Sequence, residues 1–338
     1  MNARHAVAVA LAGLLAPLLA GLSWLGPPPA HQESDVWTNR IDQGVRAGAA
    51  RIRGPKIVFV GCSNLIFGLR ADSLSRRVGL PVVNYGLFAG IGLDYAADRA
   101  AEIVGPGDIV ILAPEHINWW HAGPHPTGYR EDWLRYLAAE RDAGKDRAPL
   151  FSLERARRGC TQLRRALHER FMAIDLGRSS RAAVPFGPYD VQAIGADGQL
   201  HFPRPQSVGF AFEDPPSSPK ALNYTDSWAV NVLARLPQLC RERGATFVVM
   251  PPFRLAQAGS ARSDFLLDHE RRWMGEAVAR GALQLLAPGE TVLPPEFGYD
   301  SEYHLNDRGV AVMEKKLVAA IATLLEGLPQ PGKSSGRP

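Results

Sequence analysis

Short apolar runs alternate with amphipathic stretches along most of this chain. Continuous apolar runs of four to eight residues are typical of strands buried on both faces of a parallel sheet. Strands are predicted at residues 57–61, 81–86, 108–116 and 245–251. Helices are predicted at residues 70–78, 93–104, 226–243, 263–279 and 307–325. Strands that alternate with helices predict an α/β domain, in which helices cover both faces of a parallel sheet.

The beginning of the chain has a different pattern. Residues from Ala6 to Gly26 are apolar and carry no charge, and about 20 such residues cross a bilayer. Arg4 on the short flank predicts that this end stays in the cytoplasm and that the rest is exported. A signal anchor is favoured over a cleaved signal peptide, because the run is long and is followed by PPPAHQ without a clear A-x-A site. We expect an inner-membrane anchor with the body facing the periplasm or the cell exterior.

The segment boundaries follow from the same pattern. Residues 1–26 form the signal anchor or signal peptide, and residues 27–54, with three prolines and a polar helical stretch, form a stalk. The domain spans 55–325, and aromatic, proline-rich and arginine-rich sequence at about 119–221 predicts an inserted cap. Residues 326–338 form a disordered tail.

Composition narrows the classes of function. The 338 residues are 46% hydrophobic, enough for one sizeable core. The net charge is +4, and no dense Lys/Arg stripe with interleaved aromatics occurs, which disfavours nucleic-acid binding. The arginine-rich stretch 155–170 is interpreted as the solvated face of a helix, with contact to anionic lipid or polymer as the alternative.

Three cysteines, Cys62, Cys160 and Cys240, exclude a disulfide scaffold and a CxxC zinc or redox site. Buried, reduced thiols are favoured for all three. A Cys160–Cys240 bridge is the alternative if the domain lies outside the cytoplasm.

Candidate chemistry is expected where parallel strands end, because ligands bind at the carboxyl edge of such sheets. Gly61, Cys62, Ser63 and Asn64 follow the first predicted strand, and the glycine permits a tight turn that exposes the serine hydroxyl. The alternative for Ser63 is the N-cap of the next helix.

A second polar loop lies near the other end of the chain. Residues 299–309 read YDSEYHLNDRG and place His304 directly before a predicted helix, with Asp300 and Glu302 close by. A histidine with a neighbouring carboxylate has the composition of a general base and its orienting acid. The alternative is a surface histidine beside acidic neighbours.

Three segments taken together resemble a known family. GCSNLIFG, VVNYGLFAG and DSEYHLNDRG resemble, in this order, the blocks of SGNH (GDSL-like) hydrolases. The likeness is closest to the membrane-associated branch that includes the alginate O-acetylation proteins and the D-alanyl transfer protein of teichoic acid synthesis. It covers residues 56–118 and 224–325 and implies a flavodoxin-like three-layer α/β/α fold. It also implies Ser63 as nucleophile, His304 as general base, and the amides of Ser63 and Gly86 as oxyanion hole.

The chain departs from the family pattern near the histidine. Ser301 occupies the position where the family usually has aspartate. Asp300 is therefore expected to orient His304, with Glu302 or an unassisted Ser63–His304 dyad as the alternatives.

A second departure concerns the block after the third strand. Residues 113–118 read APEHIN where the family has GxND. Asn118 or Glu115 is expected to stand in as the side-chain donor of the oxyanion hole, unless the hole lacks one. In other enzymes, one such donor lowers the activation barrier by roughly 3 kcal/mol.

Two other chemistries compete at these positions. Cys62 adjoins Ser63 but is expected to pack inward. His116, His121 and His125 could gather around a metal, although their spacing fits no standard zinc signature. Trp119 and Trp120 equally suit a sugar-stacking or lipid-facing wall.

These observations predict an extracytoplasmic serine esterase or O-acyltransferase that forms an acyl-enzyme on Ser63. The resemblance points to acyl groups on a cell-envelope or secreted polysaccharide as substrate, and a transferase would need a membrane acyl-donor protein. No organic cofactor is expected, because the chain has no Gly-rich dinucleotide or P-loop motif. The alternative is a non-catalytic binding or assembly component of a polysaccharide or envelope system.

Overall fold

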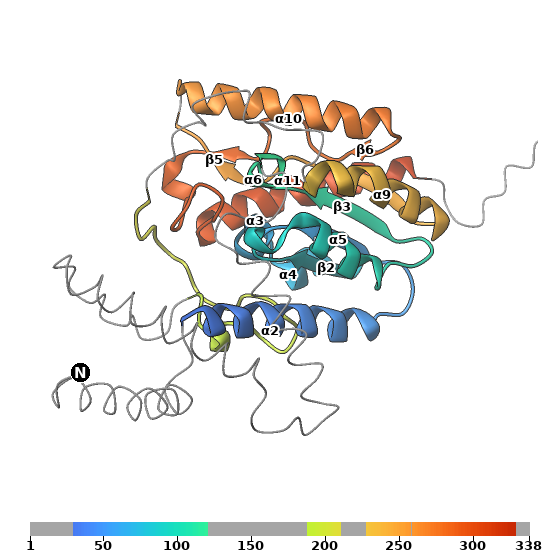
Figure 1. Cartoon of the computed structure of the whole chain (residues 1–338), viewed down its shortest axis with the longest axis horizontal. Coiled ribbons are helices and arrows are strands. Elements are labelled where there is room, and N and C mark those ends of the chain that lie inside the picture. Colours follow the sequence, from blue (N-terminus) through green and yellow to red (C-terminus); the bar gives the residue numbers. More distant parts are fainter. Residues whose placement is uncertain (1–29, 121–187, 211–227, 258, 329–338) are drawn as a thin grey trace, which may run out of the picture. The chain divides into compact units, whose positions relative to one another are not determined.

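The computed structural model describes residues 30–120, 188–210, 228–257 and 259–328 (Figure 1). The chain divides into two compact units. The smaller unit comprises Met1–Trp37 and Leu134–Val191, and in its described part the indole Nε1 of Trp37 donates a hydrogen bond to the carbonyl of Pro188 at 3.0 Å. The larger unit, Thr38–Trp133 and Gln192–Pro338, contains the sheet and every residue of the candidate site.

The larger unit is built on a five-stranded parallel sheet with strand order β2-β1-β3-β4-β6. The strands are β1 (Ile57–Gly61), β2 (Val82–Gly86), β3 (Ile109–Ala113), β4 (Thr246–Val249) and β6 (Leu283–Gln284). The predicted α/β class and parallel sheet are thereby confirmed. The sequence pattern did not indicate β6, because it has two residues and both are exposed.

Helices lie on both faces of the sheet (Figure 1). They are α3 (Ser63–Gly68), α4 (Ala71–Val78), α5 (Leu93–Ala101), α6 (Ile117–Trp120), α9 (Trp228–Glu242), α10 (Ala261–Ala279) and α11 (Asp307–Gly327). Ile57, Phe59 and Ile111 share one core cluster with residues of α3, α4 and α11. Since side chains alternate along a strand, Val58 and Val60 point to the opposite face, where α5 and α9 pack. Burial on both faces explains the continuous apolar runs.

Short elements complete this unit. Strands β5 (Arg254–Leu255) and β7 (Val292–Leu293) form a separate two-stranded parallel sheet. The 3-10 turns are η1 (Ala89–Ile91), η2 (Val191–Ala193) and η4 (Pro295–Phe297). Strand β5 contains Arg254, whose side chain is buried at 1% exposure.

The segment predicted as a stalk is largely helical. Helix α2 (Ala30–Ala50) includes Ile41 and Val45, which are buried at 1% and 2% exposure. The Asp42 carboxylate accepts a hydrogen bond from Arg99 Nη2 at 3.0 Å and another from the Tyr85 hydroxyl. The part of the predicted stalk from residue 38 onward therefore packs with the domain.

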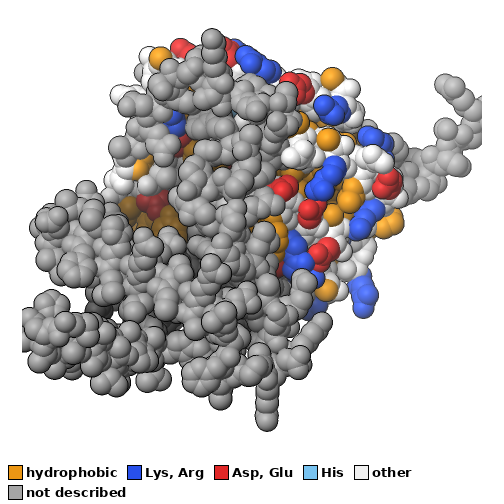
Figure 2. Space-filling model, viewed as in Figure 1, with side chains coloured by type: hydrophobic (Ala, Val, Ile, Leu, Met, Phe, Trp, Pro, Cys, Tyr) orange, Lys and Arg blue, Asp and Glu red, His pale blue; other side chains and the backbone are white. Residues whose placement is uncertain are grey.

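The predicted membrane segment, residues 1–26, lies outside the described residues, as do most of the predicted cap and all but three residues of the predicted tail. Within the described part of the chain, no helix is both long enough and apolar enough to cross a membrane. The described surface in Figure 2 shows basic and acidic side chains interspersed. Pairs such as Arg99–Glu102 at 2.7 Å and Arg271–Asp268 at 3.0 Å contribute to this mixture.

Candidate active site

The turn that carries Ser63 is fixed by two glycines at the ends of neighbouring strands. Gly61 ends β1 and Gly86 ends β2, in register with each other. A Cβ atom on Gly86 would lie 2.8 Å from the Cys62 carbonyl oxygen, and one on Gly61 would lie 2.5 Å from the Ala113 carbonyl oxygen. Only glycine permits these approaches. After the extended residue Cys62, Ser63 begins α3 and is 8% exposed.

The loop that carries His304 is held by main-chain hydrogen bonds. Tyr299 N–H donates to the His304 carbonyl at 2.7 Å. Asn306 caps α11, since its Oδ1 accepts from Gly309 N–H at 3.0 Å, while its Nδ2 donates to the carbonyls of Glu296 and Gly298. One buried asparagine thus joins the loop, η4 and the helix, which fixes where His304 can lie.

The structure brings Ser63, His304 and Asp300 into one hydrogen-bonded chain. His304 Nε2 lies 2.9 Å from Ser63 Oγ, and His304 Nδ1 lies 2.6 Å from Asp300 Oδ1. The imidazole also stacks on Phe67, with ring centroids 3.9 Å apart and planes 9° apart. The order serine, histidine, carboxylate is that of a nucleophile, its base and an orienting acid.

The other carboxylate of the loop has a different partner. Glu302 Oε2 accepts a hydrogen bond from Arg262 Nε at 2.9 Å, and Glu302 Oε1 accepts a second one from Arg262 Nη2. Ser301, at the usual family position of aspartate, accepts through its hydroxyl from Tyr303 N–H at 3.3 Å. Of the alternatives left open by the sequence, Asp300 is the carboxylate that contacts His304.

Glu115 contacts the serine from the other side. Its Oε1 lies 2.9 Å from Ser63 Oγ and accepts from Asn64 N–H at 2.7 Å. Burial raises the pKa of Glu115, whereas the charge of His304 and these hydrogen bonds lower it. The effect of burial is the larger, so the pKa is raised overall. A protonated Glu115 can donate to Ser63 Oγ, which leaves the serine proton directed at His304 Nε2. This is the proton arrangement that a histidine base requires.

The residues expected in the oxyanion hole are engaged with the protein. Gly86 N–H donates to the Asn84 side chain at 3.0 Å. Asn118 is fully buried, and its Oδ1 lies 2.9 Å from the Cys62 thiol. Cys62 packs inward as expected, at 2% exposure, and burial raises its pKa. In this arrangement the Gly86 N–H is already used, whereas Asn118 Nδ2 has no hydrogen-bond partner among the described residues. The Ser63 N–H, at the start of α3, has no partner within the helix.

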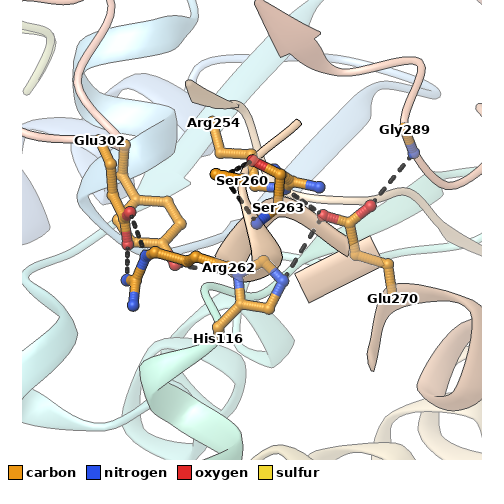
Figure 3. Close-up of polar contacts among 9 residues, drawn as sticks. His116, Arg254, Ser260, Arg262, Ser263, Glu270, Gly289 and Glu302 are labelled. Atoms are coloured by element: carbon orange, nitrogen blue, oxygen red, sulfur yellow. Dashed lines mark hydrogen bonds and ion pairs between the residues drawn. The ribbon is translucent and has the colours of Figure 1, made fainter. Parts of the chain in front are cut away.

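A second polar cluster is centred on His116 and Glu270 (Figure 3). His116 Nδ1 lies 2.9 Å from the Tyr303 hydroxyl, and His116 Nε2 lies 3.5 Å from Glu270 Oε1. Arg254 Nε donates to the same oxygen at 2.6 Å, and Gly289 N–H donates to Glu270 Oε2 at 3.1 Å. Burial would raise the pKa of Glu270, but the contacts with His116 and Arg254 hold it below its usual value.

Of the three histidines considered as metal ligands, only His116 is among the described residues. His116 belongs to the polar cluster just described, and His121 and His125 lie outside the described residues. No group of three or more potential metal ligands occurs in residues 30–120, 188–210, 228–257 and 259–328. Trp119 is buried at 0% exposure and stacks on Trp273 at 5.3 Å, so its ring forms core rather than a surface wall. The Arg155–Arg170 stretch and Cys160 are also outside, while Cys240 is a buried free thiol.

Two residues beside the site were not identified from the sequence. Phe67 lies four residues after Ser63, a spacing that puts both on one side of a helix, and this was the available signal. Arg204 lies within the predicted cap, and its guanidinium is 5.2 Å above the Phe67 ring. Nothing in its sequence neighbourhood marks it, because it meets the site only through the tertiary fold.

Comparison with known proteins adds no assignment. No protein-family model, curated protein or solved structure matches the chain. What can be inferred about function therefore depends on the arrangement of side chains and on the sequence segments already described.

Proposed function

We propose that this chain is an SGNH-type serine esterase or O-acyltransferase that acts through an acyl-enzyme on Ser63. The observation that carries the proposal is the hydrogen-bonded chain from Ser63 Oγ through the His304 imidazole to Asp300. Three side chains, of which Ser63 and His304 lie 241 positions apart, meet in the geometry of a nucleophile, base and orienting carboxylate.

The chemistry follows from the proton positions. His304 Nε2 takes the Ser63 proton as Oγ attacks the carbonyl carbon of the substrate's acyl group. When the tetrahedral intermediate collapses, the bond to the alcohol oxygen breaks and His304 returns the proton to that oxygen. Water or a second hydroxyl, deprotonated by His304, then attacks the acyl-enzyme, and Ser63 recovers its proton.

The neighbours of His304 support these steps. Asp300 accepts a hydrogen bond from His304 Nδ1–H, holds the tautomer that leaves Nε2 free to accept, and stabilises the imidazolium once it forms. Phe67 packs flat against the ring and restricts its rotation. Burial raises the pKa of Glu115, and when this carboxyl is protonated it can donate to Ser63 Oγ and takes no proton from the serine.

The substrate class is proposed from the sequence. The resemblance to the membrane-associated SGNH branch and the predicted export signal support acyl groups on a cell-envelope or secreted polysaccharide, handled by a membrane-anchored protein facing the periplasm or cell exterior. If the acceptor is a sugar hydroxyl, a membrane protein must supply the acyl donor.

One observation favours the alternative of a non-catalytic binding or assembly component. The Gly86 N–H is bonded to the Asn84 side chain, so an oxyanion would lack one donor of the family pattern. A serine-directed probe separates the two functions.

The test is labelling of the full chain in mild detergent with a fluorophosphonate, followed by mass analysis of the modified peptide. We expect label on Ser63 in the wild type, none in Ser63→Ala, and slow labelling in His304→Ala, with p-nitrophenyl acetate turnover following the same order. Folded wild-type protein that neither labels nor turns over ester would support the assembly role instead.

A further inference from the structure

Arg204 is a buried arginine in which two side-chain nitrogens have no hydrogen-bond acceptor among the described residues. It is 3% exposed, and its Nε and Nη1 are buried with no hydrogen-bond partner in the described part of the chain. A guanidinium has five N–H donors and cannot give up its charge at neutral pH. Burial lowers the pKa of Arg204 to about 10, which still leaves it protonated. Burying an uncompensated charge is costly, so such a group normally has an anionic partner.

The nearest carboxylates are already engaged. Asp307 Oδ1 accepts from Arg70 Nη2 at 2.6 Å, and Asp307 Oδ2 accepts from the backbone N–H of Arg204 at 2.9 Å rather than from its guanidinium. Asp300 is bonded to His304. Asp307 holds the Arg204 backbone in place, and the charges of Asp307 and Asp300 act on the guanidinium from nearby, but Nε and Nη1 of Arg204 have no hydrogen bond to either acid.

The position of this cation relates it to the candidate active site. The Arg204 guanidinium lies 5.2 Å from the centroid of Phe67, and the same ring stacks on His304 at 3.9 Å. The Phe67 ring contacts one face of the guanidinium by a cation–π interaction, which provides no hydrogen-bond acceptor for its N–H groups. One aromatic ring therefore contacts both the proposed base and a cation with unused donors.

We propose that Arg204 binds an oxyanion substituent, such as a carboxylate or sulfate, on the molecule whose acyl group reacts at Ser63. The inference rests on the proposed function and adds a substrate class to it: an anionic acyl ester rather than a neutral one. The substrate's negative oxygens accept the N–H groups that the protein leaves unpaired, and the ester then lies on the His304 side of Phe67. Charge-assisted hydrogen bonds of this kind are about twice as strong as neutral ones.

The kinetic test uses three acetyl esters with the same leaving-group skeleton: 4-acetoxybenzoate, 4-acetoxybenzenesulfonate and methyl 4-acetoxybenzoate. In wild type, kcat/KM for the two anions should exceed that for the neutral ester by about tenfold, as one charge-assisted contact predicts. Arg204→Met, which keeps an unbranched stem over Phe67, should abolish this preference, so that the ratio of kcat/KM for the anionic esters to that for the neutral ester falls to about one. Arg308→Met removes an exposed arginine and should change none of the ratios.

Two kinetic outcomes overturn the proposal. An equal loss on all three esters in Arg204→Met would mean that Arg204 only supports the Phe67–His304 stack. Unchanged ratios would mean that no substrate charge reaches it. If the methionine variant does not fold, Arg204→Lys, which keeps the charge, should retain the anion preference in part and must do so for the proposal to stand.

A binding measurement keeps this test independent of catalysis. Benzoate is titrated into Ser63→Ala and into Ser63→Ala/Arg204→Met by calorimetry at constant ionic strength. The dissociation constant should rise about tenfold or more in the double variant, whatever the esterase assays give. Equal binding by both proteins would overturn the role of Arg204, whereas wild type without any ester turnover would overturn the proposed function alone.

Discussion

Two polar networks share the loop after β3 and the loop before α11, and they differ in the role that their hydrogen bonds suit. The serine network comprises Ser63, Glu115, His304 and Asp300, and the buried network comprises His116, Tyr303, Arg254 and Glu270. Neighbouring residues divide between them: Glu115 and His304 contact the serine, while His116 and Tyr303 contact each other.

The two networks differ in whether their hydrogen-bonding protons can change partners. In the serine network one hydroxyl proton lies between two possible acceptors, so the protons can be redistributed. In the buried network, Glu270 receives hydrogen bonds from Arg254 and a backbone N–H at both its oxygens and stays ionised. The first arrangement suits proton transfer and the second suits rigid support of the loops. Substitutions in the two networks should therefore separate activity from stability.

The largest effect is expected for the nucleophile and its base. Ser63→Ala or His304→Ala should each lower kcat for p-nitrophenyl acetate by up to about a millionfold, because the two groups act as a unit. The melting temperature should change by only a few degrees. Steady-state kinetics and calorimetry on the same preparations measure both, and residual turnover above about a hundredth of wild type in Ser63→Ala would contradict the assignment.

The two carboxylates that flank His304 form a matched pair. Asp300→Asn should reduce kcat by about 10,000-fold, since the amide stabilises the wrong tautomer of His304, with the midpoint of denaturation little changed. Glu302→Gln should leave kcat per folded molecule within about tenfold and lower stability, because Arg262 loses its charge partner. Measurement of kcat and of urea unfolding for both variants separates the two roles. A large loss of kcat in Glu302→Gln with little loss in Asp300→Asn would assign the orienting role to Glu302.

Breaking the buried network should primarily affect stability. Glu270→Ala leaves Arg254 buried and unpaired, at 1% exposure, and is expected to lower the free energy of unfolding by about 3–5 kcal/mol. Replacement of the exposed Glu276 on the same helix by alanine serves as the control and should cost under about 1 kcal/mol. Urea unfolding checks both values. Loss of activity without loss of stability in Glu270→Ala would place this carboxylate in the chemistry.

The smallest effects concern pH, and their signs differ between the networks. The pKa of Glu115 is raised in the folded state, so the stability it contributes is lost as pH rises above its ordinary value of 4.5. Glu115→Gln should reduce this loss. Unfolding free energies measured from pH 4.5 upward check it, and a steeper fall in the variant would mean that Glu115 is ionised when folded.

His269 should give the opposite slope. Burial, with smaller contributions from His116 and Arg272, lowers its pKa to about 2 from an ordinary 6.5. The unfolded chain takes up a proton below pH 6.5 that the folded protein excludes, so stability falls as the pH falls through this range. His269→Gln should flatten the fall between pH 7 and 5. Denaturant midpoints across this range decide it.

The sequence was informative where a local pattern defines the structure. Period and run length predicted four of the five strands of the main sheet. A polar residue after the first strand pointed to Ser63, and a polar loop before the last helix pointed to His304 and Asp300. The pattern could not show that Asn84 would occupy the Gly86 N–H, because that bond depends on how the strand end turns. It also could not place Arg204, Glu302 or Tyr303, whose partners are set by packing between distant segments.

The distance along the chain between Ser63 and His304 has a consequence for biosynthesis. Translation produces the serine 241 residues before the histidine, so a chain still on the ribosome has the hydroxyl without its partner. The strand ends and α3 can form early, but the Ser63–His304 hydrogen bond requires α11 to dock on α3 and α4. Under the proposed function, a nascent or truncated chain has an unactivated serine, and reaction of Ser63 with a serine-directed probe would report that the last helix has docked.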